Sequence, residues 1–322
     1  MKTISELKKD LVFNREMSEL MDILKKTATF EFQSLFNRRK MQTVQEKYVA
    51  ALEDLLKIFS SGAQHPFLTN PRDKVILVVI TSDMGFVGGL NTEVVDTGLR
   101  EIRKNDELHL LALGEKGYLQ LEEKGYKFEF LPGMGPDMNF SLAEKVRDYI
   151  YASCWKYKVG RVVISYPKFI SFAHQEIATD VLVPCGHLFK SDPSSPDGLS
   201  RPDGRGSPEA AGQDSTAPAT TDGPVNELRT RTRFLFEPSS HKVLDYLLKT
   251  YLAYKIYDIF WQAKLSEFAA RSMHLDGSMQ ELTDMKKGIQ SQYFRSKHEI
   301  TDRTIRDIFG GRMVTLKKLR NA

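Results

Sequence analysis

The last third of the chain, from Phe234 to about Leu319, has apolar residues at the spacing of one long helix. This helix is too long for a small domain to cover its apolar face. The apolar residues recur at three- and four-residue steps, the pattern of a helix with one buried face: Val243, Leu244, Leu247, Leu248, Tyr251, Leu252, Ile256, Ile259, Phe260, Ala263 and Phe268. A helix of roughly 70 residues is on the order of 100 Å long. Such a helix needs a partner along its length.

The ends of this helix are marked by residue type. Pro238 cannot lie inside a helix, whereas Ser239 or Ser240 can accept a hydrogen bond from the free N–H groups of the first turn. No comparable stop signal comes before Gly310–Gly311. Gly277 lies within the helical pattern, and a glycine within a helix costs about 1 kcal/mol relative to alanine. The sequence therefore allows a bend or break near Asp276–Ser278.

The N-terminal residues predict a second long helix, which we place at residues 1–62. Its apolar residues keep a spacing near 3.5, with charged residues between them: Ile4, Leu7, Leu11, Met17, Leu20, Met21, Leu24, Ala28, Met41, Val44, Tyr48, Ala51, Leu52, Leu55 and Phe59. Neither long helix can bury its apolar stripe alone. We therefore predict an antiparallel coiled coil formed by residues 1–62 and 234–322. The alternative is that each helix packs separately on the middle of the protein.

Composition excludes several classes of protein. The chain has 322 residues, 41% hydrophobic and 27% charged, and a net charge of +4, which is too weak to indicate a nucleic-acid partner. No apolar run has the length of a signal peptide or a membrane-spanning helix. Cys154 and Cys185 lack CxxC spacing and are expected to be ordinary thiols in a reducing compartment. No metal or other cofactor is expected.

The middle of the chain, residues 73–186, alternates between strand and helix patterns. Strands are expected at Lys74–Ser82, Leu108–Gly114, Phe128–Leu131, Arg161–Phe169 and, as an edge strand, His174–Val183. Helices are expected at Asn91–Lys104, Lys116–Lys124 and Ser141–Cys154, the last with a capping box of Ser141 and Glu144. This alternation predicts a Rossmann-like, doubly wound α/β sheet domain beside the coiled coil.

The loop after the first strand, TSDMGFVGGLN, invites a nucleotide-binding interpretation but does not fit one. It lacks both the G-x-G-x-x-G fingerprint and the lysine of a phosphate-binding loop. Gly85, Gly88 and Gly89 are instead expected to permit a tight turn and close packing. Asp83 is expected to be a turn or cap residue, because spacing ties no second acid, histidine or nucleophile to it.

Residues 187–228 differ sharply in composition from their surroundings. They are rich in proline, serine, glycine and aspartate, and they cannot bury enough apolar surface to offset the entropy of ordering. We expect a disordered insertion that acts as a passive loop. Deletion of Ser191–Asn226 should then leave assembly with partners intact.

Several segments of the sequence resemble those of a known family. FLFEPSSHKVLDYLL (Phe234–Leu248), YLAYKIY (Tyr251–Tyr257) and SEFAAR (Ser266–Arg271) are similar to the C-terminal block of the gamma subunit of F-type ATP synthases. VVITSDMGFVGGLN (Val78–Asn91) and ISYPKFISFAHQE (Ile164–Glu176) are similar to strand segments of that family. The order of parts matches as well, and the resemblance covers nearly the whole chain.

The resemblance implies a central-stalk rotor subunit without catalytic activity of its own. In that family the coiled coil is inserted in a ring of alpha and beta subunits, while the α/β domain sits with the epsilon subunit on the membrane c-ring. Rotation couples ion translocation to ATP synthesis or hydrolysis, because the asymmetric shaft shifts each catalytic site between states. The implied location is peripheral to the membrane, on the cytoplasmic face of the inner or plasma membrane.

Residues matching the family's motifs carry the site hypothesis. The motif positions are Asp83, Gly88, Gly89, Asn91, Glu237, Pro238, Ser266, Glu267 and Arg271. The resemblance implies partner contacts at Met21, Ile23, Leu24, Arg295, Lys297, His298, Thr301 and Asp302. The chain also departs from the family: Thr27-Ala28 replaces a serine-lysine pair, and a basic run, Arg312–Arg320, extends a tip that is shorter and apolar in the family.

Two alternatives remain open at this stage. A divergent paralogue could keep the fold as a coiled-coil interaction protein, and genes for ring and epsilon subunits would then be absent nearby. A nucleotide-using α/β enzyme would bind nucleotide as an isolated chain. If the shaft interpretation holds, proline at Leu247 or Ile256 should abolish assembly by kinking the C-terminal helix.

Overall fold

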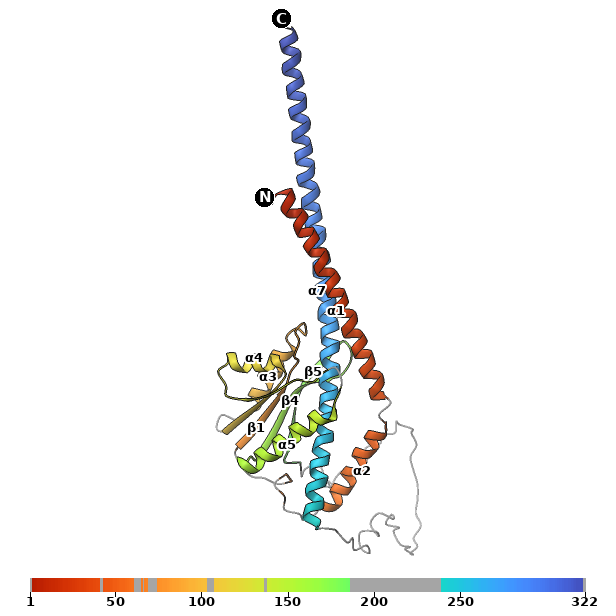
Figure 1. Cartoon of the computed structure of the whole chain (residues 1–322), viewed down its shortest axis with the longest axis vertical. Coiled ribbons are helices and arrows are strands. Elements are labelled where there is room, and N and C mark those ends of the chain that lie inside the picture. Colours follow the sequence, from red (N-terminus) through yellow and green to blue (C-terminus); the bar gives the residue numbers. More distant parts are fainter. Residues whose placement is uncertain are drawn as a thin grey trace, which may run out of the picture.

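The computed structural model describes residues 2–40, 43–60, 65, 67–68, 74–102, 107–135, 138–185 and 239–320. The elements in chain order are α1 (Ile4–Lys40), α2 (Thr43–Ser60), β1 (Lys74–Ile80), α3 (Leu90–Arg100), β2 (Glu107–Leu113), α4 (Glu115–Glu123), β3 (Glu129–Leu131), α5 (Phe140–Lys156), β4 (Arg161–Phe169), β5 (Gln175–Val183) and α7 (Ser240–Arg320). A sheet domain lies beside the lower part of α7, which extends far beyond it (Figure 1). The insertion expected at 187–228 lies outside the described residues.

The five predicted strands form one sheet in the order β3-β2-β1-β4-β5. Strands β1 to β4 are parallel, and β5 runs antiparallel to β4 at the edge. The chain moves outward from β1 to β3 and then returns through α5 to β4 on the other side of β1. This reversal confirms the predicted doubly wound fold and places a topological switch point between β1 and β4.

Both faces of the sheet are covered, which explains the continuous apolar run of β1. Val75, Leu77 and Val79 point toward α3 and α4, while Ile76, Val78 and Ile80 belong to a larger core with α2, α5 and α7. A parallel strand buried on both faces is expected to show no polar alternation. The same apolar face of α7 that faces the sheet thus supplies much of the main core.

The start of α5 corrects one local prediction. The helix begins at Phe140, and its cap is Asn139, whose side chain accepts a hydrogen bond from Ser141 N–H at 2.9 Å. Ser141 therefore lies inside the first turn, and Glu144 forms an ion pair with Arg147 at 3.6 Å. Asparagine and serine cap helices about equally well, so residue type alone could not choose between them.

Helices α1 and α7 pack side by side in opposite directions (Figure 1), as the two apolar stripes predicted. Lys25 forms an ion pair with Asp276, the Thr29 and Ser272 hydroxyls lie 2.9 Å apart, and Arg39 donates to Asp258 at 2.8 Å. We call α1 together with α7 from Asp258 onward the shaft.

Two continuous seams run along the shaft at alternating three- and four-residue steps. Every seam position is buried or half-buried: Leu7, Leu11, Asn14, Ser18, Met21, Lys25, Ala28, Phe32 and Leu35 on α1, and Ser272, Leu275, Met279, Leu282, Lys286, Ile289, Tyr293 and Ser296 on α7. This is the heptad spacing of a coiled coil. Asn14 is nearly fully buried, and its amide has no hydrogen-bond partner among the described residues.

The N-terminal segment forms two helices where one was predicted. The first ends at Lys40 and the second begins at Thr43, and α2 returns toward the lower part of α7 (Figure 1). There Leu52 and Leu56 are buried, and the Tyr48 ring lies 5.1 Å from that of Tyr254. A straight continuation of α1 would have left these side chains unburied, so packing accounts for the change of direction.

The C-terminal helix is unbroken from Ser240 to Arg320. Its start agrees with prediction, since Lys242 N–H donates to the Ser239 hydroxyl at 3.4 Å. The bend considered near Asp276–Ser278 is not observed. Packing supports the helix there, because Leu275 is fully buried and Asp276 is paired with α1. No helix among the described residues is both long and apolar enough to cross a bilayer.

The two cysteines are free thiols inside the sheet domain. Burial raises the pKa of Cys154 and of Cys185 to about 12 each, from an ordinary value of 9.0. Because the thiolate is the reactive form, we expect alkylation by iodoacetamide at pH 8 to be slower by about a thousandfold than in the urea-unfolded chain. Equal alkylation rates before and after unfolding would contradict this burial.

Candidate functional site: the shaft and its junction with the sheet

The glycine loop after β1 is docked on α7 by a buried ion cluster. Glu267 lies between Lys264, at 2.9 Å, and Arg271, at 2.6 Å, and all three residues are at most 6% exposed. Arg271 also donates to the Gly85 carbonyl at 3.1 Å, and Lys264 donates to the Met134 carbonyl at 2.9 Å. The cluster thus ties the loops after β1 and β3 to the shaft.

Other motif residues shape the same loop. Asn91 accepts a hydrogen bond from Ser82 N–H at 3.0 Å, and Asp83 accepts one from Glu115 N–H at 3.1 Å. Gly88 has a φ of +61°, a conformation that favours glycine, and Gly89 precedes the first turn of α3. Asp83 is therefore a structural acceptor at the start of α4, in agreement with its predicted turn or cap role.

Helix α7 fills the crevice where a doubly wound sheet usually binds ligands. In such folds the crevice lies at the carboxyl ends of the strands, at the switch point. Here Ala263 and Glu267 face Thr81 and Asn91 across a cavity of only about 10 Å³. That volume is near the minimum for a single water molecule. This arrangement supports the packing interpretation of the glycine loop over a nucleotide site.

The remaining motif residues are less informative. Ser266 is fully buried, and its hydroxyl has no hydrogen-bond partner among the described residues. Glu237 and Pro238 lie outside the described residues. Sequence reasoning selected Glu267 and Arg271 but missed Lys264. The signal was available, since Lys264, Glu267 and Arg271 are spaced at i, i+3 and i+7 on a face that is otherwise apolar.

The predicted partner contacts form two separate groups along the shaft. Met21 and Leu24 are half-buried, whereas Ile23 is 61% exposed. The second group is exposed and lies farther along α7: Arg295, Lys297, His298, Thr301 and Asp302. From the register of Lys25 with Asp276, the groups are separated by roughly 30 Å at 1.5 Å per residue. They do not form one patch.

The outer face of α1 carries exposed apolar side chains that α7 does not cover. Phe13, Leu20, Ile23 and Phe30 are all more than half exposed. On α7, Met285 and Phe294 are also more than half exposed. A row of large apolar side chains in water is typical of a surface that contacts other proteins.

The tip of α7 continues as a single helix beyond the start of α1 (Figure 1). The shared register of the Lys25–Asp276 and Thr29–Ser272 pairs places Ile4 near the level of Lys297. Residues 298–320 therefore project by roughly 35 Å. Their described side chains, through Met313, are all exposed, and the large apolar ones are Ile300, Ile305, Ile308, Phe309 and Met313.

The chain is similar to known proteins both by a family model and by pairwise sequence comparison. The family model described as ATP synthase matches residues 21–313. The ATP synthase gamma chain of Desulforudis audaxviator is 28% identical over 272 residues, which cover 82% of this chain and 83% of that protein.

Two similar solved structures come from the mitochondrial ATP synthase of Euglena gracilis. A chain in the structure with the F1 sector and c-ring has a TM-score of 0.65 at 14% identity, covering 97% of this chain and 94% of its own length. A chain in the rotor structure has a TM-score of 0.62 at 16% identity, covering 92% and 98%. At these identities the likeness shows the fold.

Proposed function

The chain belongs to the ATP synthase gamma family, and we propose that it acts there as a non-catalytic shaft turning inside a ring of alpha and beta subunits. As a member of this family it is a central-stalk rotor subunit of an F-type ATP synthase.

The observation that carries the proposal is the projecting tip of α7. A single helix with exposed apolar side chains, extending roughly 35 Å beyond its partner, is unfavourable in water unless other proteins surround it. A ring of subunits would cover Ile305, Phe309 and their neighbours from all sides. The exposed contact group that begins at Arg295 and ends at Asp302 then lies at the entrance to that ring, and Met21 to Leu24 lie farther down.

The shaft can impose different states on equivalent subunits because its sides differ. One side presents the apolar row of α1, including Phe13 and Phe30, while α7 presents charged residues interspersed with Met285 and Phe294. A catalytic subunit that meets one face is stabilised in a different conformation from one that meets another. Rotation then shifts the populations of the catalytic sites in turn.

We also propose that the subunit itself catalyses no reaction. This is supported by α7, which fills the switch-point crevice and leaves about 10 Å³ there. We place the sheet domain with the epsilon subunit on the c-ring. The assembly would lie on the cytoplasmic face of the inner or plasma membrane, to which this chain binds peripherally.

Affinity purification from the native cell tests the proposed function. A tagged chain should bring down alpha, beta and epsilon subunits in a complex that hydrolyses ATP, whereas the isolated chain should have no such activity. Recovery without ring subunits would instead favour the interaction-protein alternative.

A further inference from the structure

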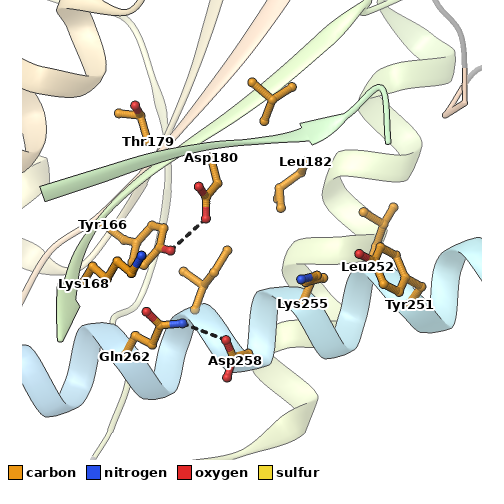
Figure 2. Close-up of a pocket in the computed structure, with 12 residues that line it drawn as sticks. Tyr166, Lys168, Thr179, Asp180, Leu182, Tyr251, Leu252, Lys255, Asp258 and Gln262 are labelled. Carbon is orange, nitrogen blue, oxygen red and sulfur yellow. Dashed lines mark hydrogen bonds between the residues drawn. The ribbon is translucent and has the colours of Figure 1, made fainter. Parts of the chain in front are cut away.

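The paired helices of the shaft are held together differently along their length. In the lower half, polar bonds cross from α1 to α7. Asp258 accepts hydrogen bonds from Arg39 of α1 and from Gln262 of its own helix, each at 2.8 Å, and Figure 2 shows the second. The Lys25–Asp276 pair is the last crossing bond toward the N-terminus. Along residues 2–24, no hydrogen bond or ion pair joins α1 to α7 among the described residues.

Asn14 lies within this half that lacks crossing bonds. The register of Lys25 with Asp276 places it at the level of Lys287, and the nearest seam residue of α7 is Lys286. Asn14 is only 2% exposed, and neither its amide oxygen nor its amide nitrogen has a hydrogen-bond partner among the described residues. A buried amide without partners favours states in which water reaches it, because water restores its hydrogen bonds. Asn14 therefore opposes the closed pairing of the two helices.

The seam residues around Asn14 do little to offset this effect. Ser18, one turn farther along the seam, donates to the Asn14 carbonyl at 2.9 Å, so its hydroxyl is used within its own helix. Of the apolar seam residues from Leu7 to Met21, only Leu7 is nearly fully buried, while Leu11 and Met21 are half-buried. Hydrophobic stabilisation grows with the apolar area removed from water. This end of α1 is therefore weakly held.

We propose that the first four turns of α1, Ile4–Ser18, form a strap that separates from α7 while the rest of the shaft stays paired. Segments with few buried apolar contacts and few crossing bonds open locally before the rest of a protein unfolds. A helix of this length is marginal in water on its own, so the separated strap loses its helical hydrogen bonds. Opening lengthens the single-helix part of the shaft by roughly 20 Å. The strap is a property of this chain and does not rest on the proposed function.

Hydrogen exchange of the isolated full chain, followed by mass spectrometry, tests the strap. The backbone amides of residues 8–18 should exchange at least tenfold faster than those of residues 22–35, which the crossing bonds hold to α7. Fraying from a helix end also gives such a gradient, so the decisive variant is Asn14→Leu, which replaces the amide by an apolar side chain. Exchange of residues 8–18 should then slow by about tenfold. Higher helix propensity alone would slow it by about threefold at most.

Two further variants separate the strap from other effects. Arg15→Leu is the matched control, because it adds the same side chain at an exposed neighbouring position outside the seam, and exchange should stay within threefold of the original. In Leu7→Cys, the new thiol lies in the strap, and its alkylation by iodoacetamide should slow by about tenfold when Asn14→Leu is added. The proposal is overturned if residues 8–18 exchange no faster than residues 22–35, or if Asn14→Leu slows their exchange by threefold or less.

Discussion

Replacing Lys287 by proline is expected to leave a folded chain that no longer supports coupled turnover in the assembled complex. Lys287 is exposed on the shaft and pairs with Asp284 on the same helix, so its side chain contributes little to stability. Proline removes a helical hydrogen bond and clashes with the preceding turn, at a cost of about 3 kcal/mol. The effect therefore comes from the backbone.

The mechanical consequence follows from the length beyond the substitution. About 50 Å of helix lies between Lys287 and Arg320 at 1.5 Å per residue. A kink of about 20° would displace the tip by roughly 17 Å, more than the diameter of a helix. A tip displaced this far cannot remain on the axis of a surrounding ring.

The measurement is ATP-driven ion pumping by the reconstituted complex, with ATP hydrolysis measured in parallel. Lys287→Ala is the matched control, because it removes the same charge and keeps the helix; it should pump normally. We expect pumping to fall at least tenfold in Lys287→Pro. If the proline variant pumps as well as the alanine variant, a straight shaft is not required. Circular dichroism should confirm that both chains are folded.

This position is a sharper test than proline at Leu247 or Ile256. Those residues are buried in the core beneath the sheet. Proline there would disrupt the packing of the domain as well as the direction of the helix. Loss of assembly would then have two causes that the experiment could not separate.

The sequence predicted the parts of the fold that depend on repeated local patterns. The β-branched run of β1 and the long apolar stripe of α7 each repeat one residue pattern many times. One residue that departs from the pattern therefore does not change the predicted element. The split between α1 and α2 was missed, because heptad spacing continues past Lys40 and only packing against the lower part of α7 redirects the chain. The Asn139 cap was missed for a different reason, since it depends on a single residue and the nearby Ser141 is an equally good cap by residue type.

The sequence identified residues of the candidate site but not the contacts that they make in the folded chain. Glu267 and Arg271 were identified through a family motif, yet their role in docking the Gly85 loop depends on contacts between residues nearly 190 positions apart. Separation in sequence thus explains most of what the patterns did not show.

The junction between sheet and shaft should depend on Glu267 more than on any other single charge in the cluster. Glu267→Ala would leave Lys264 and Arg271 buried side by side without their shared carboxylate. Breaking a buried ion pair by removing one partner typically costs about 3–5 kcal/mol, because a desolvated charge remains. Urea unfolding of the full chain, followed by circular dichroism and tyrosine fluorescence, should show this loss.

Two variants separate the ion cluster from a general effect of mutating the helix. Glu281→Ala, at an exposed position on α7, should change stability by less than about 0.5 kcal/mol. Replacing Lys264, Glu267 and Arg271 together by methionine, leucine and methionine should recover much of the loss, since no unpaired charge is then buried. A loss below about 1 kcal/mol in Glu267→Ala would mean that the cations reach water, and that the sheet domain is held on the shaft by apolar contacts instead.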